Sequence, residues 1–282
     1  MLSDLSQLIR LSRLFDAAFP LVSLFLGVAV INQFDNKAIY LLIPLVIILN
    51  SVAMIWNDIE DKEVDADNGR PELAKSGEAL LQRLKFYLAI LVINSLLLAW
   101  LVNLTAFILT VATLCVIWVY NSKPIQASRR PIMSIVVLSG AGAFLPYLFG
   151  LSLENIETHV FLAGVCWWVG RISLSVLKDY KDARGDARHH KKTFLLCYGI
   201  RKVAFVSVIS LCLGYAAFIG LVYSPRNTAW GLSAIILAIG LFAYMRRPLF
   251  NPKASYVQLD GTFRQLAQYQ LLLDAGVVFW LI

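Results

Sequence analysis

The chain has 282 residues, of which 59% are hydrophobic and 15% are charged, with a formal net charge of +7. Soluble domains carry about one charged residue in four, so this composition excludes an ordinary soluble domain and favours a protein of the bilayer. In a soluble protein the positive charge would suggest a nucleic-acid partner. Here we expect no nucleic acid, because the distribution of the charge indicates membrane topology instead.

Apolar stretches long enough to cross about 30 Å of hydrocarbon as helices recur along nearly the whole chain. In chain order they cover 16–34, 38–57, 85–102, 104–121, 132–151, 158–178, 202–223, 229–245 and 266–282. The last is interrupted by Asp274 and is the least regular. The sequence therefore predicts an all-α fold: a single integral membrane domain over 1–282 that forms a bundle of about nine transmembrane helices.

Basic residues lie almost entirely in alternate loops, which share one side of this arrangement. Of the 25 Lys and Arg residues, 22 fall on the side of the N-terminus, whereas Lys37 and Arg226 fall on the other and Arg171 lies inside a span. In membrane proteins the side rich in Lys and Arg is usually cytoplasmic. We therefore expect the N-terminus inside and the C-terminus outside.

An acidic cluster closes the second predicted span, over residues 57–65 (NDIEDKEVD). If the helix continues through it, Asn57, Asp61 and Asp65 recur every four residues and lie on one face. Like charges at this spacing repel each other and would destabilise an isolated helix. We therefore expect a positive charge near this cluster.

A second acidic cluster closes the sixth predicted span, over residues 178–186 (KDYKDARGD). Asp179, Asp182 and Asp186 follow the spacing i, i+3, i+7, which again places them on one helical face. Both clusters lie on the expected cytoplasmic side, so they can face each other. Magnesium is typically bound by a few carboxylates together with substrate phosphates. The two clusters therefore predict a magnesium–diphosphate site where a central cavity opens to the cytoplasm.

One acidic run at a helix end is usually a solvated loop, but two matched runs at the same membrane face favour a site. Basic side chains flank both clusters, and positive-inside topology alone explains most of them. Arg70 and Lys178 are the better candidates for diphosphate contacts, because they lie within or just beyond the clusters.

With these clusters in place, the sequence resembles the UbiA superfamily of intramembrane prenyltransferases. Residues 57–65, with the pattern N-D-x-x-D-x-x-x-D, are similar to that family's first motif, and the N-x-R-P of residues 68–71 is similar to its usual continuation. Residues 179–186, with the pattern D-x-x-D-x-x-G-D, resemble the second motif. The resemblance extends from about Arg13 to the seventh predicted span and is strongest over 13–215.

The resemblance implies magnesium ions, a diphosphate held by aspartates and basic side chains, and a hydrophobic tunnel for an isoprenoid tail. The residues expected on magnesium, directly or through water, are Asn57, Asp61, Asp65, Asp179, Asp182 and Asp186. Those expected on the diphosphate are Arg70, Tyr120, Lys123, Arg129 and Lys178. Asp61, Asp182, Arg70 and Lys178 are the expected catalytic residues, and Asp58 is expected to orient basic groups.

The leading hypothesis is magnesium-dependent transfer of an isoprenyl group from a prenyl diphosphate to a small aromatic or lipid acceptor within the membrane, with release of diphosphate. An alternative uses the same site without an acceptor, as a UbiA-type membrane terpene cyclase. A cation transporter is disfavoured, because its carboxylates should lie near the membrane midplane rather than at one face. Neither the acceptor nor the donor length follows from the motifs.

Three features depart from the family pattern, the first being that Arg129 or Arg130 replaces a Lys often found in the fourth-to-fifth loop. The basic run at residues 189–192 (HHKK) stands where the family often has a Gly before a Thr. An Arg-Glu pair is common shortly before the second motif, whereas here Arg171-Ile172 lies further upstream. A charge inside a span is costly and usually functional, so Arg171 is expected either to serve the site or, instead, to pair with another intramembrane group or to snorkel toward the interface.

Overall fold

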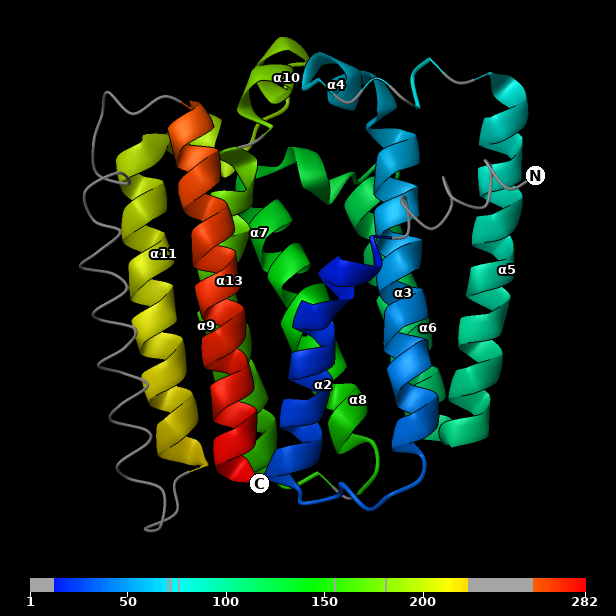
Figure 1. The fold of residues 1–282 in the computed structure, drawn as a ribbon, viewed down its shortest axis with the longest axis vertical. Helices are drawn as coiled ribbons and strands as arrows, with labels where there is room; N and C mark the ends of the chain where they lie inside the picture. The colour runs from blue at the N-terminus through cyan, green and yellow to red at the C-terminus, as the bar shows by residue number, and fades with distance from the viewer. Residues whose placement is uncertain are drawn as a thin grey trace.

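The computed structural model describes residues 13–69, 71, 73–75, 77–154, 156–180, 182–222 and 256–282. Within these residues every regular element is a helix, with η marking short 3-10 or π turns. In chain order they are η1 (Leu14–Ala17), α2 (Ala18–Val30), α3 (Ile39–Glu60), α4 (Lys62–Asp67), α5 (Glu78–Val102), α6 (Leu104–Asn121), η2 (Ala127–Arg129), α7 (Pro131–Ser139), η3 (Gly140–Phe144), α8 (Leu145–Leu151), α9 (Thr158–Leu177), η4 (Lys178–Tyr180), α10 (Ala183–Arg188), α11 (Phe194–Leu221) and α13 (Tyr256–Leu281). The long helices stand side by side in a bundle, and the short α4 and α10 lie across one end of it (Figure 1).

Six segments of the described chain are helical, long and apolar enough to cross a membrane. They are α3, α5, α6, the continuous run Pro131–Leu151, the run Thr158–Tyr180, and α11. The helix α2 is apolar but has only 13 residues. The predicted span 229–245 lies outside the described residues, whereas the other predicted spans all coincide with helices. The all-α prediction is confirmed for the described chain, and the count of nine stays a prediction.

Three helices begin earlier than their apolar stretches indicated. Helix α5 begins at Glu78, α11 at Phe194 and α13 at Tyr256, each at least seven residues before the predicted span. Hydropathy detects only the part of a helix that matches hydrocarbon, whereas in α5 and α13 the first turns also contain polar residues and continue the same helix. In α11 the boundary is marked by Gly199, whose φ of +79° kinks the helix.

Small residues bring α9 and α11 into close contact. A Cβ atom added to Gly214 would lie 2.2 Å from the backbone nitrogen of Gly170, so the two backbones touch at this level. Close approach of this kind is characteristic of helix pairs in membranes, where packing replaces the hydrophobic effect. Trp167 and Phe218 fill the adjoining core, with ring centroids 5.5 Å apart. This closely packed helix pair is the wall that carries the second acidic cluster.

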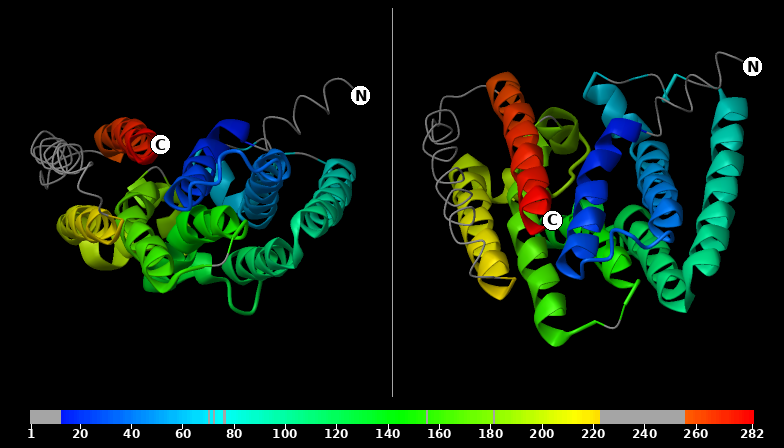
Figure 2. Two further views of the ribbon diagram at one scale, coloured as in Figure 1. Left: turned by 90° about the horizontal axis from the view of Figure 1, so that it is seen from below. Right: turned by 60° about the horizontal axis from the view of Figure 1, so that its bottom comes forward.

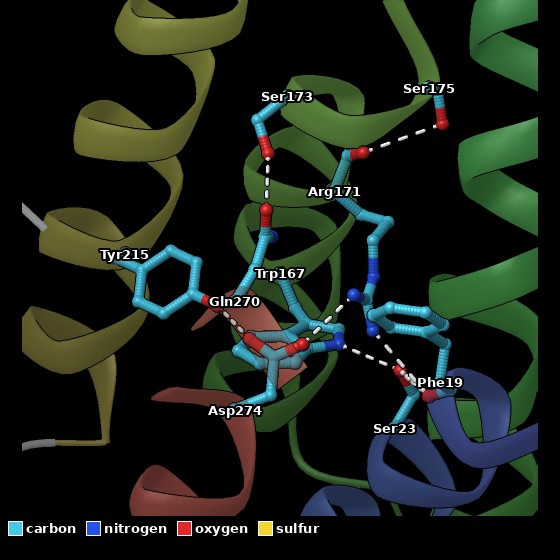
Figure 3. Close-up of polar contacts among 9 residues, drawn as sticks. All are labelled: Phe19, Ser23, Trp167, Arg171, Ser173, Ser175, Tyr215, Gln270 and Asp274. Atoms are coloured by element: carbon cyan, nitrogen blue, oxygen red, sulfur yellow. Dashed lines mark hydrogen bonds and ion pairs between the residues drawn. The ribbon is translucent and has the colours of Figure 1, made fainter. Parts of the chain in front are cut away.

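A buried polar cluster ties α13 to its neighbours (Figure 3). Arg171 Nη1 on α9 lies 2.8 Å from Asp274 Oδ2 on α13, and both side chains are buried. The hydroxyl of Tyr215 on α11 donates to the other oxygen of Asp274. Arg171 Nη2 also donates to the carbonyl of Phe19 on α2, at 3.4 Å. Of the expectations for Arg171, the structure therefore shows pairing with another intramembrane group.

Further contacts reinforce the same level of the bundle. Ser173 Oγ donates to Gln270 Oε1 at 2.9 Å, and Trp167 Nε1 donates to Ser23 Oγ at 3.0 Å. Helices α2, α9, α11 and α13 are thus joined by side-chain hydrogen bonds as well as by apolar packing.

On the other side, α5 stands at an edge of the bundle (Figures 1 and 2). Its large apolar side chains, such as Phe86 and Trp100, face outward, as a lipid-facing helix requires.

Candidate active site

The first acidic segment interrupts its helix instead of extending it. Helix α3 ends at Glu60, Asp61 takes φ −99° and ψ 14°, and α4 starts at Lys62. The helix is therefore not continuous through residues 57–65, although the amides of Asp61 and Asp65 still donate to the carbonyls of Asn57 and Asp61. The turn at Asp61 leads the chain over the end of the bundle (Figure 1).

The second acidic segment is interrupted in a similar way. Helix α9 ends at Leu177, the 3-10 turn η4 carries Asp179, and Asp182 lies at the N-cap of α10, which carries Asp186. The helix is again not continuous, although all three aspartates remain on the same side of the bundle. The turn brings α10 beside α4 (Figure 1).

A close backbone contact holds α4 and α10 together. The amide of Gly185 donates to Asn68 Oδ1 at 2.7 Å. A Cβ atom at Gly185 would come within 2.6 Å of both the Val64 carbonyl oxygen and Asn68 Nδ2. Only glycine fits between these groups, so the motif's Gly185 fixes the separation of the two acidic segments.

A polar pocket with an empty volume of about 480 Å³ opens between the two segments. Its lining residues are Arg13, Asn57, Asp61, Val64, Asp65, Asn68, Tyr120, Ser128, Lys178, Asp179, Asp182, Asp186 and Lys191. All six residues expected on magnesium are therefore brought together from two segments more than a hundred residues apart in the sequence. Tyr120 and Lys178, expected on the diphosphate, line the same pocket.

Other expected diphosphate contacts are placed differently. Lys123 is exposed in the loop after α6, and Arg129 is half-buried in η2; neither lines the pocket. Arg70 lies outside the described residues. In their place the pocket contains Arg13 and Lys191, which the sequence interpretation did not select.

Of these two cations, Lys191 lies near carboxylates of both acidic segments. Its Nζ donates to Asp61 Oδ2 at 2.8 Å and lies 3.7 Å from Asp186 Oδ1. The same Asp61 oxygen accepts from Asn57 Nδ2 at 3.0 Å. Burial lowers the pKa of Lys191, but Asp61 and Asp186 outweigh it, so the pKa lies above its usual value and the ammonium stays charged. The only sequence feature that could have indicated Lys191 as a pocket residue is its position five residues after Asp186.

Two further pairs orient basic groups around the pocket. Arg13 Nη2 donates to Asp58 Oδ1 at 2.5 Å, so Asp58 orients a guanidinium, which is the kind of role expected for it. Lys178 Nζ donates to the hydroxyl of Tyr120 and lies 5.1 Å from the centroid of its ring. Both cations are thereby held at the pocket wall before any ligand arrives.

The donor set fits a hard divalent cation. Asp61 Oδ1, Asp179 Oδ2 and Asp186 Oδ1 are buried and accept no hydrogen bond, and buried carboxylate oxygens of this kind are costly without a cation. Burial raises the pKa of Asp186 to about 7, with Lys191 opposing the shift. Among the described residues, no three Asp, Glu, His or Cys side chains are close enough to enclose an ion as they stand. A cation would therefore draw in carboxylates from both segments.

An apolar pocket with an empty volume of about 520 Å³ adjoins the polar one. Its lining residues are Pro20, Val46, Leu49, Asn50, Ala53, Met54, Thr113, Ile117, Leu138, Ala141, Gly142, Leu145, Pro146 and Phe149. Met54 Sδ lies 4.0 Å from Nη1 of Arg13, which lines the polar pocket, so the linings of the two pockets are in contact. On α3, Met54 precedes Asn57 by three residues, or about 4.5 Å along the axis. The geometry offers a charged head site directly above an apolar chamber.

Comparison with known proteins identifies the family of the chain. The model of the UbiA prenyltransferase family matches residues 18–255. The chain belongs to the UbiA prenyltransferase family. This confirms the family indicated by the two motifs and its enzyme class, a prenyltransferase. With its apolar helices, this UbiA family member is an integral membrane protein.

Among its relatives is the digeranylgeranylglyceryl phosphate synthase of Methanospirillum hungatei, 28% identical over 80% of this chain and 83% of the relative. Another is the 4-hydroxybenzoate octaprenyltransferase of Klebsiella pneumoniae, 23% identical over 74% of this chain and 75% of the relative. These two relatives of the UbiA family member have different names and so do not decide its acceptor.

Solved structures show the same fold. A structure described as digeranylgeranylglyceryl phosphate synthase superposes with a TM-score of 0.71 at 18% identity, covering 99% of each chain. A UbiA homologue from Archaeoglobus fulgidus, bound to GPP and Mg2+, superposes with a TM-score of 0.69 at 14% identity, covering 96% of this chain and 99% of that one. The UbiA fold is therefore confirmed.

Proposed function

We propose that this chain transfers a prenyl group from a prenyl diphosphate to an acceptor within the membrane and releases diphosphate, with Mg2+ bound by the two acidic segments. The observation that carries the proposal is the polar pocket between these segments, whose lining residue Arg13 contacts Met54 in the lining of an apolar pocket. The A. fulgidus structure bound to GPP and Mg2+ supports the same pairing of ligand and metal.

We assign magnesium binding to the six pocket residues selected by the motifs: Asn57, Asp61, Asp65, Asp179, Asp182 and Asp186. Bound magnesium would neutralise the diphosphate as it leaves. Lys178, held by Tyr120, contributes a further positive charge at the pocket wall, where negative charge develops as the carbon–oxygen bond breaks. Arg70, Lys123 and Arg129 complete the proposed diphosphate contacts from outside the described pocket lining.

The apolar pocket would hold the isoprenoid tail and exclude water from the allylic carbon. Ala53, Ala141 and Gly142 leave room along its wall, and Met54 and Leu145 provide an apolar surface. Excluding water protects a developing carbocation until the acceptor captures it. The head of the donor would lie at the level of Asn57, where the polar lining begins.

For the acceptor we infer a glyceryl phosphate that already carries one prenyl ether, by analogy with the M. hungatei relative. For topology we keep the orientation given by the basic loops: the site faces the cytoplasm and the N-terminus lies inside. The described chain forms one bundle, and we propose that 1–282 acts as a single domain.

The deciding experiment is product analysis with purified protein in lipid vesicles. Geranylgeranyl diphosphate is supplied with Mg2+ and, in separate reactions, with geranylgeranylglyceryl phosphate, with 4-hydroxybenzoate, or with no acceptor. We expect diphosphate release and a doubly prenylated glyceryl phosphate in the first reaction, and no product from Asp182→Ala.

Prenylated 4-hydroxybenzoate would overturn the inferred acceptor while supporting transfer. A hydrocarbon released without an acceptor would identify a terpene cyclase instead. If neither geranylgeranyl diphosphate nor a shorter prenyl diphosphate yields diphosphate in any reaction, the proposed function is wrong.

A further inference from the structure

Lys191 contacts both acidic segments at once. Its Nζ lies 2.8 Å from Asp61 Oδ2 in the first segment and 3.7 Å from Asp186 Oδ1 in the second. The Lys191 side chain is 11% exposed, and those of Asp61 and Asp186 are 8% and 3% exposed. A surface ion pair of this kind would contribute little, but here three charges meet where water has limited access.

The backbone around Lys191 keeps the ammonium in this place. The amide of Lys191 donates to the Asp186 carbonyl at 2.8 Å, which closes the turn after α10. Two residues later, the Thr193 side chain caps α11 by accepting from the amide of Leu196 at 3.4 Å. The neighbouring Lys192 is exposed. The turn therefore directs one lysine of the pair inward and leaves the other outside.

The inward lysine stands where a shared metal ion would have to bind. Magnesium needs oxygen ligands at about 2.0–2.1 Å, so an ion shared by Asp61 and Asp186 would lie between these two carboxylates. An ammonium between the same carboxylates competes with it, because two cations this close repel strongly in a poorly hydrated pocket. One of them has to leave.

We propose that Lys191 is a built-in counter-cation, which holds Asp61 and Asp186 together without magnesium and is displaced toward the diphosphate oxygens when magnesium binds. The proposal rests on the magnesium site of the proposed function and adds a residue that neither motif contains. A lysine suits this exchange, because its charge sits on a flexible stem with three donors.

The test uses full-length protein purified with Mg2+ throughout, as wild type, Lys191→Met, Lys191→Arg and the control Lys192→Met. Melting temperature is followed after chelation and during titration with Mg2+. Lys191→Met should melt at a lower temperature than wild type after chelation, yet reach half-saturation at about tenfold less Mg2+, since one charged hydrogen bond no longer competes. Lys191→Arg should keep the stability of the chelated protein, and Lys192→Met should match wild type throughout.

A second measurement tests the displaced position. With Mg2+ saturating, inorganic diphosphate should bind Lys191→Met about tenfold more weakly than wild type, because a charge-assisted contact is lost. Equal diphosphate binding by the two proteins would overturn this half of the proposal.

The outcomes separate this inference from the proposed function. A wild type that responds to Mg2+, beside a Lys191→Met variant with the same titration and the same chelated stability, would overturn the role of Lys191 alone. A wild type that neither responds to Mg2+ nor binds diphosphate would overturn the magnesium site itself. Failure of Lys191→Met to remain folded after chelation, with recovery in Mg2+, would support the counter-cation.

Discussion

Arg171 and Asp274 form an ion pair within the bundle, with 2.8 Å between Nη1 and Oδ2 and with 6% and 0% of their side chains exposed. The guanidinium also lies 4.9 Å from the centroid of the Phe19 ring. Tyr215 donates to the same carboxylate, so four helices meet at one charge pair (Figure 3). The pair connects the last helix to the wall that carries Asp179.

Removing either charge of this pair should destabilise the fold. Arg171→Leu or Asp274→Leu leaves an uncompensated buried charge, and we expect the free energy of unfolding to fall by about 3–5 kcal/mol. The double variant should recover most of this loss, because apolar replacements satisfy each other. Unfolding in mixed micelles measures all three. Arg201→Leu, which removes an exposed charge on α11, serves as the control.

Removing a carboxylate from either acidic segment should abolish turnover. We expect Asp61→Ala and Asp182→Ala each to lower turnover at least about 1,000-fold, since charge stabilisation of the leaving group is lost. Glu63→Ala is the matched control, because Glu63 belongs to the same acidic segment but is exposed. All three proteins should insert and fold. Near-normal turnover in both aspartate variants would contradict a site built from two segments.

Separating α4 from α10 should damage the site without touching a charge. In Gly185→Ala the new methyl group meets the Val64 carbonyl oxygen at 2.6 Å, and backbone cannot yield cheaply. We expect weaker Mg2+ binding and turnover reduced by about tenfold or more, because small displacements of a site are costly. Gly276→Ala places its methyl group in open space and should match wild type. An unchanged Mg2+ titration for Gly185→Ala would exclude this spacing role.

Filling the apolar pocket should shorten the donor that the enzyme accepts. Gly142 lines the pocket, and a Cβ atom there meets nothing within 4 Å. We expect Gly142→Leu to lower kcat/KM for geranylgeranyl diphosphate by at least about tenfold while sparing geranyl diphosphate, since the added carbons occupy the space of the tail. Gly220→Leu, also in open space on α11, controls for the substitution. An equal loss for both donors would place the tail elsewhere.

The helical membrane fold was predictable from sequence, and so was the gathering of the motif residues around one pocket. Apolar stretches reveal membrane spans because a helix that crosses hydrocarbon must be mostly apolar. The spacing of Asp residues in the two motifs indicated residues that line one pocket. The course of the chain through those motifs was not predictable. Repulsion between stacked carboxylates favours a break, but whether it falls at Asp61 depends on packing against α10.

Pairings between residues distant in the sequence were not predictable, for a different reason. In the sequence, Asp274 interrupts the last span and Arg171 is a possible site residue. Nothing in the sequence indicates that these two residues, about a hundred positions apart, pair with each other. Lys191 was hidden in a basic run that topology already explained. Only the fold distinguishes an inward lysine from the exposed Lys192 beside it.

Helix α3 and the Asp61 that follows it line both pockets in sequence order, with Asn50, Ala53 and Met54 in the apolar pocket and Asn57 and Asp61 in the polar one. Successive turns of a single helix thus face the tail and the head of the proposed donor. Substitutions on α3 one or two turns from the acidic segment can therefore change the length of the prenyl donor during evolution. The residues that break the carbon–oxygen bond stay the same. Divergence in product length within such a fold needs no change in its ionic residues.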